Sequence, residues 1–168
     1  MEDIAASAQV SRATIYLHFP GKPMLLKALL EEDWQQQIRL FERLANVQVL
    51  EVEQLGKWVL RVAEGMRKAR DSFGIHWAAL GQNPELIMRH CEHRTELAGL
   101  LLHWAAGDDD TQALATAIEA ELIVAELEHF ATAAALVWSD EQLWAALPMV
   151  VSRVSKFAAG LETRPQTD

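Results

Sequence analysis

Residues that favour helices run through almost the whole chain of 168 residues, and this pattern constrains its fold more than any other feature. Ala, Leu, Glu and Gln are abundant, and no stretch alternates apolar and polar residues as a half-buried strand does. Hydrophobic residues make up 51% of the chain, which is enough for a sizeable buried core. The sequence therefore predicts an all-α fold in which glycine and proline separate the helices.

The positions of these breaks set the expected helix boundaries. Pro84 follows Asn83 as a favourable first helical residue, and Ser139 followed by Gln142 has the spacing of a capping box. Pro148 lies inside the last expected helix and is predicted to kink it or split it in two. The expected helices cover approximately residues 2–8, 11–18, 22–44, 51–71, 73–80, 84–106, 108–138 and 140–160.

Residues 2–19 have the layout of two short helices joined by a tight turn. Ser11 is a favourable N-cap for the second helix. The side chains expected to face inward, or to plug the turn, are Ile4, Ala5, Ala8, Val10 and Ile15. Those left at exposed or edge positions are Arg12, Ala13, Thr14, Tyr16 and His18. This is the layout of a helix-turn-helix, whose second helix presents its first residues to base edges in the major groove.

Lys22 stands at the expected start of the third helix. A cation there opposes the helix dipole and costs about 0.3–1 kcal/mol. A phosphate group would reverse that sign, because the lysine and the free N–H groups of the helix end both attract it. A solvated lysine is the alternative, but the neighbouring motif favours a phosphate contact.

The first thirty residues resemble the DNA-binding signature of the TetR family of transcriptional regulators. The matching residues are Ile4-Ala5, Val10-Ser11, Thr14-Ile15-Tyr16, His18-Phe19, Lys22 and Leu25-Leu26. The resemblance implies an all-α homodimer that binds a palindromic operator, usually as a repressor released by a small ligand. It also implies base-edge contacts from Arg12, Ala13 and Thr14, and phosphate contacts from Ser11, Tyr16, His18 and Lys22.

Two features depart from that family's pattern. Gln9 occupies a turn position where the family usually has glycine, and it would be strained there if the turn needs a positive φ. The family also has a helix before the position of Glu2, which completes a three-helix core. We therefore expect Met1 to correspond to an internal residue of a longer parent chain.

The charge of the chain is unevenly distributed and suggests two domains. The net charge is −9, yet residues 1–30 hold Glu2 and Asp3 against Arg12, Lys22 and Lys27, a balance of +1 that leaves −10 for residues 31–168. This asymmetry suits a DNA-binding end on a body that DNA repels. We expect a helix-turn-helix module, truncated at its N-terminus, over residues 1–30 and a ligand-binding and dimerisation domain over residues 31–168.

Large apolar and aromatic side chains in the body predict a pocket for a small molecule of unknown identity. A sensor needs a mostly apolar cavity with a few polar groups, although such side chains also build ordinary cores. The candidate lining residues are Trp58, Met66, Phe73, His76, Trp77 and Phe130.

A metal site at His90, Cys91 and His93 is a weaker alternative interpretation of the body. His90 and His93 can share a helix face, but Cys91 points about 100° away from His90. No second ligand cluster follows, so neither a metal nor another cofactor is expected.

Two stripes on the last two long helices predict either a core within one subunit or a dimer interface. The family's dimers use these helices, and we adopt the interface interpretation. One stripe has small residues at Ala113, Ala117, Ala120, Val124 and Leu127, and the other is apolar, at Leu143, Leu147, Val150, Val151, Val154, Phe157 and Ala158.

The remaining signals exclude several other classes. A single cysteine, a start without a basic leader and the lack of a long apolar run predict a cytoplasmic protein with no membrane partner. No nucleophile elbow, phosphate loop, HExxH or paired catalytic acid is present, so an enzyme is not expected. The sequence does not exclude a histidine that acts as a general base, such as His76.

The sequence therefore predicts a ligand-responsive transcriptional regulator, a repressor that binds a palindromic operator as a homodimer. The alternative is a dimeric ligand- or partner-binding module that cannot bind DNA.

Overall fold

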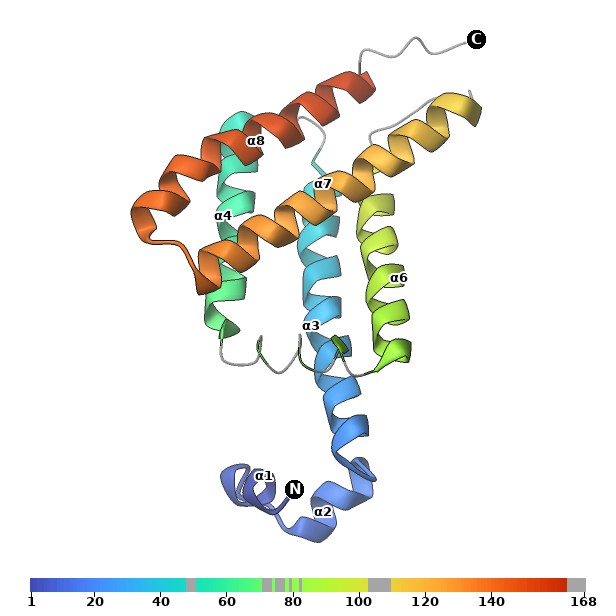
Figure 1. The fold of residues 1–168 in the computed structure, drawn as a ribbon, viewed down its shortest axis with the longest axis vertical. Coiled ribbons are helices and arrows are strands. Elements are labelled where there is room, and N and C mark those ends of the chain that lie inside the picture. Colours follow the sequence, from blue (N-terminus) through green and yellow to red (C-terminus); the bar gives the residue numbers. More distant parts are fainter. Residues whose placement is uncertain are drawn as a thin grey trace. The chain divides into compact units, whose positions relative to one another are not determined.

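The computed structural model describes residues 1–47, 51–70, 74, 78, 80–81, 83–102 and 110–162. The predicted all-α class is confirmed, since these residues contain helices and no strand. The helices are α1 (Glu2–Ser7), α2 (Arg12–His18), α3 (Lys22–Ala45), α4 (Val52–Lys68), α6 (Pro84–Leu101), α7 (Asp110–Leu136) and α8 (Asp140–Glu162) (Figure 1). None of these helices is long and apolar enough to cross a membrane.

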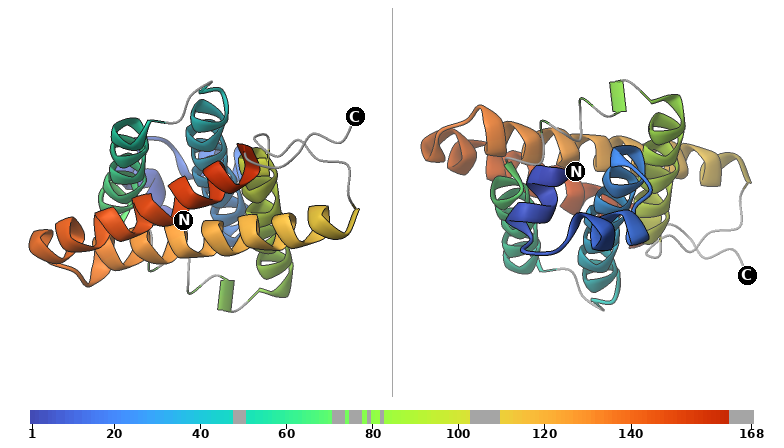
Figure 2. Two further views of the ribbon diagram at one scale, coloured as in Figure 1. Left: turned by 90° about the horizontal axis from the view of Figure 1, so that it is seen from above. Right: turned by 90° about the horizontal axis from the view of Figure 1, so that it is seen from below.

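The chain divides into two compact units, Met1–Gln36 and Gln37–Asp168. The first holds α1, α2 and the beginning of α3. In the second, α7 contacts α4, α6 and α8, and α4 also contacts α8. Figure 2 shows α7 and α8 side by side, crossing α4 and α6.

Close packing of α7 against three neighbours explains its composition. Ala120 and Ala131 are fully buried, and the small side chains of Ala133, Ala134 and Ala135 are also buried. Small residues let helix axes approach each other closely. Because neighbours cover α7 on several sides, its apolar residues are not confined to one narrow stripe.

The core of the second unit lies between α3, α4, α6, α7 and α8. Leu55 and Val59 of α4, Leu101 of α6, Leu127 of α7 and Val154 of α8 are each at most 1% exposed. Burying a side chain of this size contributes about 1.5–3 kcal/mol. This core holds the unit together.

Several expected helix ends are confirmed, and one expected break within a helix is absent. The side chain of Asn83 accepts a hydrogen bond from the Glu85 amide at 3.0 Å, and Pro84 is the first residue of α6. Of the two outcomes predicted for Pro148, the split does not occur, since α8 runs through Pro148 as one helix, and the kink stays a prediction. The bond that proline cannot make would have gone to the carbonyl of Trp144, an exposed residue, so water can replace it. The short helix expected over residues 73–80 lies largely outside the described residues.

The two stripes predicted to form a dimer interface lie mainly in the core of the chain itself. Ala120, Val124 and Leu127 of the small stripe are at most 2% exposed. Most of the apolar stripe is also buried, at Leu143, Val150, Val151, Val154, Phe157 and Ala158. The interface interpretation was wrong for these residues, because a helical pattern identifies a buried face without identifying what covers it.

Candidate nucleic-acid interface

The turn between α1 and α2 contains the one non-glycine residue with positive φ in the described part of the chain, Gln9 at 55°. The Val10 amide donates to the Ala5 carbonyl at 3.0 Å, and the Gln9 amide donates to the Ala6 carbonyl at 3.1 Å. This pair of bonds is a Schellman motif, which ends a helix with a left-handed residue. The turn therefore adopts the conformation that favours glycine while carrying a glutamine.

Ser11 begins the second helix as predicted. Its Oγ accepts a hydrogen bond from the Thr14 amide at 3.0 Å, and its hydroxyl lies 2.8 Å from the Thr14 hydroxyl. An N-cap of this kind stabilises a helix by about 1 kcal/mol. The cap fixes the start of α2, where Arg12, Ala13 and Thr14 are all exposed.

Contacts between α1 and α2 rest on a small apolar centre. Ala5 and Ile15 are buried, in agreement with their expected inward orientation. Ile4 and Val10, also expected to face inward or plug the turn, are 37% and 42% exposed. With few residues to bury, these two short helices leave part of their apolar surface uncovered.

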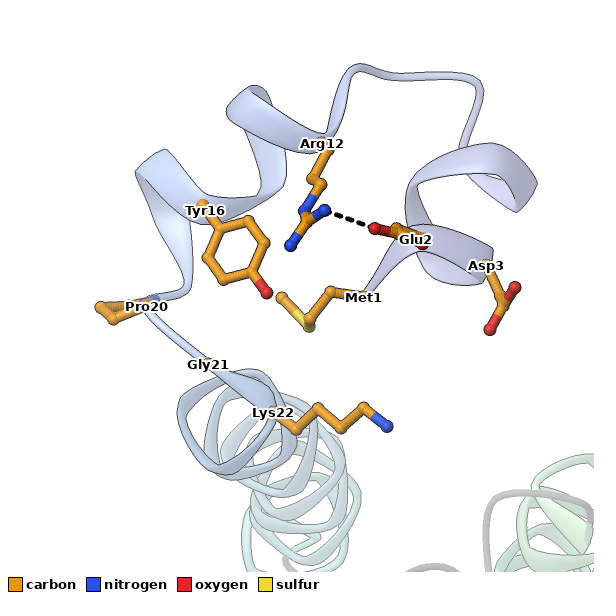
Figure 3. A pocket seen from close by; sticks show the side chains of 8 residues that line it. All are labelled: Met1, Glu2, Asp3, Arg12, Tyr16, Pro20, Gly21 and Lys22. Atoms are coloured by element: carbon orange, nitrogen blue, oxygen red, sulfur yellow. Dashed lines mark hydrogen bonds and ion pairs between the residues drawn. The ribbon is translucent and has the colours of Figure 1, made fainter.

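An open hollow of about 410 Å³ lies beside α2 (Figure 3). Arg12, Tyr16 and Lys22, which are three of the predicted DNA contacts, line it together. The other lining residues are Met1, Glu2, Asp3, Pro20 and Gly21. Of the remaining predicted contacts, Ser11, Ala13, Thr14 and His18 are exposed but do not line this hollow.

The Arg12 guanidinium has two partners in the hollow. It forms an ion pair with the Glu2 carboxylate, and it lies 5.4 Å from the centroid of the Tyr16 ring (Figure 3). A guanidinium over an aromatic face is attracted by the electrons of the ring. Glu2 was not among the predicted site residues, because no local spacing rule links it to a residue ten positions away.

Lys22 lines the hollow from the first residue of α3. This helix has 24 residues, and its first turn contains no acidic residue. The first turn therefore provides no negative charge to compensate the charge of Lys22. The free N–H groups of the helix end add positive potential at the same place. Together these groups suit an anion such as a phosphate.

The candidate pocket residues of the body are split between core and undescribed segments. Trp58 is buried, donates its indole N–H to the Leu40 carbonyl at 2.8 Å, and meets Phe41 edge to face. Phe130 is buried against Trp138, and Met66 is half-buried. Phe73, His76 and Trp77 lie outside the described residues. A ligand pocket among these six residues remains a prediction.

The residues considered for a metal site turn to different partners. His90 Nε2 lies 3.2 Å from the Glu128 carboxylate, and His93 Nε2 lies 3.2 Å from the Gln37 side-chain oxygen in the core. Cys91 is exposed. Within the described ranges, no three His, Cys, Asp or Glu side chains are grouped to hold a metal ion.

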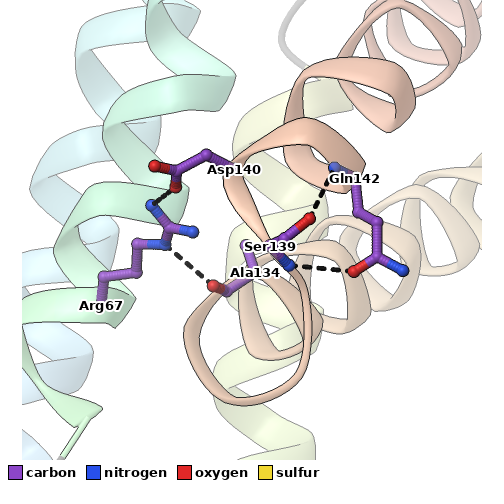
Figure 4. Close-up of polar contacts among 5 residues, drawn as sticks. All are labelled: Arg67, Ala134, Ser139, Asp140 and Gln142. Atoms are coloured by element: carbon purple, nitrogen blue, oxygen red, sulfur yellow. Dashed lines mark hydrogen bonds and ion pairs between the residues drawn. The ribbon is translucent and has the colours of Figure 1, made fainter.

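Arg67 of α4 holds the turn between α7 and α8 (Figure 4). Its Nε donates to the Ala134 carbonyl at 2.9 Å, and a terminal nitrogen lies 2.7 Å from the Asp140 carboxylate. The predicted capping box is confirmed in the same turn: the Ser139 amide donates to the Gln142 side chain at 2.9 Å, and the Gln142 amide donates to Ser139 Oγ at 3.3 Å. The end of α7 and the start of α8 are thus both capped.

Comparison with known proteins supports the interpretation of the N-terminal segment. Residues 1–29 match the family model described as "Bacterial regulatory proteins, tetR family". The matched segment contains α1, α2 and all of the residues that line the hollow. Comparisons with curated proteins and with solved structures found no match.

Proposed function

We propose that the chain, whose residues 1–29 match the model of the TetR family of bacterial regulatory proteins, binds a palindromic operator as a homodimer and releases it when a small molecule binds. The observation that carries the DNA-binding part is the juxtaposition of Arg12, Tyr16 and Lys22 around one hollow beside the capped start of α2. A regulator of this kind acts by binding and catalyses no reaction.

In the proposed complex, α2 enters the major groove with Arg12, Ala13 and Thr14 at base edges. Arg12 is suited to a guanine, whose edge accepts two hydrogen bonds from a guanidinium. Ser11, Tyr16, His18 and Lys22 contact phosphates, which fix the orientation of the helix without reading sequence. The exposure of all these side chains supports this assignment.

A homodimer is proposed because one short helix reads only a few base pairs, and two symmetric copies add their binding energies. The chain offers an apolar surface for such pairing on α7 and α8. Its members are large hydrophobic residues that are 53% to 72% exposed: Leu114, Ile118, Leu122, Trp144 and Met149. We call this set the α7–α8 face. Exposed apolar side chains that gather on one helix face are typical of protein contacts, and the four-residue spacing of Leu114, Ile118 and Leu122 places these three on one face of α7.

Release by a small molecule is proposed from the family resemblance. A ligand that binds one conformation of the dimer more tightly shifts the population toward it. Two recognition helices bind successive major grooves only when they are about 34 Å apart, so a ligand that changes this separation lowers operator affinity.

Selection of bound duplexes from a random DNA library, followed by footprinting with the full chain, tests the proposal. We expect a palindromic sequence to be enriched and protected. Lys22→Ala is expected to weaken binding to all duplexes alike and to reduce the slope of log K against log salt by about one. Lys57→Ala, which removes another exposed lysine, paired with Glu53 on α4, is the control. Failure of the wild-type chain to bind DNA at low salt would overturn the proposal.

A module that binds a ligand or partner but no DNA is the second candidate. Two acids, Glu2 and Asp3, share the hollow with Arg12 and Lys22 and weaken its attraction for phosphate. This candidate predicts a dimer that is thermally stabilised by a ligand but shifts no DNA fragment.

A further inference from the structure

We propose that Glu2 is a specificity-determining residue, which holds Arg12 away from phosphates and so suppresses binding to DNA of arbitrary sequence. This inference rests on the proposed DNA-binding function. It assigns to Glu2 a role of its own beside the residues that contact DNA.

The geometry restrains Arg12 from two sides. The Glu2 carboxylate pairs with one terminal nitrogen of the guanidinium, while the Tyr16 ring lies beneath its central carbon at 5.4 Å. All three side chains line the same hollow, and Figure 3 shows them together. Arg12 therefore has a partner on two sides of its guanidinium.

The pair is accessible to DNA and is not needed to hold the fold. The Arg12 and Glu2 side chains are 60% and 73% exposed, and exposed ion pairs contribute little to stability. The contact between α1 and α2 has its own buried centre at Ala5 and Ile15. Stability of the fold therefore does not explain the pair, and a role in DNA binding can.

The carboxylate affects the two modes of DNA binding differently. A guanidinium has five donors, so Arg12 can keep Glu2 on one edge and offer the other to a guanine. A phosphate is attracted less strongly by Arg12, because Glu2 already neutralises the charge of Arg12. The Glu2 carboxylate also repels the phosphate directly. Binding that depends only on phosphates is thus weakened more than binding that reads bases.

Glu2→Gln tests this inference, with Asp3→Asn as a matched control. Both substitutions remove one negative charge from neighbouring residues of the hollow, but only Glu2 is paired with Arg12. The probes are a short duplex of random sequence and the duplex that the wild-type chain selects. Their dissociation constants are measured over a series of salt concentrations.

We expect Glu2→Gln to tighten binding to the random duplex by at least about threefold and to steepen its salt dependence by up to about one. The ratio of selected to random affinity falls. Asp3→Asn is expected to change the random affinity by less than about twofold, because it acts only through the screened field. In an Arg12→Gln background, Glu2→Gln and Asp3→Asn have equal effects.

Two outcomes overturn the inference, and they differ in what else they affect. If the wild-type chain selects a sequence but Glu2→Gln acts like Asp3→Asn or lowers the random affinity, only the role of Glu2 fails. If the wild-type chain binds neither duplex at low salt, the proposed DNA-binding function fails with it.

Discussion

Gln9 is a residue whose backbone conformation could be predicted from the sequence. The position was singled out because a glutamine stands where the TetR family usually has glycine, and the φ of 55° confirms that the turn needs a left-handed residue. A residue with a Cβ costs about 1–2 kcal/mol in that conformation. The two Schellman hydrogen bonds offset part of this cost.

Gln9→Gly is expected to stabilise the turn by about 0.5–1 kcal/mol, because the strain disappears while the unfolded chain gains some entropy. Amide hydrogen exchange of Val10, whose N–H bonds to the Ala5 carbonyl, reports this locally. Its rate is expected to fall about two- to fivefold. Gln9→Val, which cannot relax in the left-handed region, is the opposing control and is expected to accelerate exchange. Faster exchange in Gln9→Gly would contradict the strain argument.

Other site residues differ in how far the sequence determines them. The Ser11 cap follows from a spacing of three residues, and Arg12 and Tyr16 share a face because they are four apart on a helix. The pairing of Arg12 with Glu2 depends on how α1 crosses α2, which no local pattern determines. Spacing patterns in the sequence therefore predicted the two cations of the hollow, Arg12 and Lys22, but not Glu2, the acid that pairs with Arg12.

At the scale of helices, the turn between α7 and α8 combines a local and a distant signal. The capping box was predicted from the three-residue separation of Ser139 and Gln142. The contacts of Arg67 with this turn were not predicted, since Arg67 lies 67 residues from Ala134 and 73 from Asp140. Only the packing of α4 against α7 and α8 brings it there. The sequence thus predicted the helices and several caps, whereas their cross-links depend on tertiary packing.

Arg67→Ala is expected to lower the free energy of unfolding by about 1–2 kcal/mol. The value allows for partial solvent exposure of a charged hydrogen-bonding group that caps the Ala134 carbonyl. Arg67→Lys is expected to fall between Ala and wild type, because lysine keeps the charge near Asp140 but lacks the planar fork. Urea denaturation measures the effect.

Arg153→Ala is the control for this prediction. Arg153 is 50% exposed, pairs with Glu126 at a longer distance of 3.6 Å, and is expected to contribute less than about 0.5 kcal/mol. Equal losses in the Arg67 and Arg153 variants would show that Arg67 acts as an ordinary surface charge.

At the scale of the whole molecule, amphipathic patterns predicted what is buried better than what it is buried against. The stripes of α7 and α8 are indeed covered, but by the other helices of the same unit. The exposed residues Leu114, Ile118 and Leu122 also repeat every four residues, so a helical spacing alone did not distinguish the exposed stripe of α7 from the buried one. Contacts between copies depend on the surface that remains after the core has formed.

Ile118→Glu is expected to raise the dissociation constant of the proposed homodimer by at least about 100-fold, because a charge would replace an apolar group that the second copy is proposed to cover. Sedimentation equilibrium over a range of concentrations measures the change. Met88→Glu on α6, where Met88 is 62% exposed and distant from this face in sequence, is the control and is expected to leave association unchanged. Equal association of Ile118→Glu and wild type would place the interface elsewhere.

The exposure of Trp144, at 58%, has a spectroscopic consequence. An indole in water emits at longer wavelength than one in an apolar contact, so covering this side chain with a second copy shifts its emission toward the blue. Dilution of the unlabelled protein then reverses the shift, and subtracting the spectrum of Trp144→Phe isolates it from the buried Trp34 and Trp58. If the proposed homodimer covers Trp144, its emission gives an optical signal for association at concentrations too low for sedimentation.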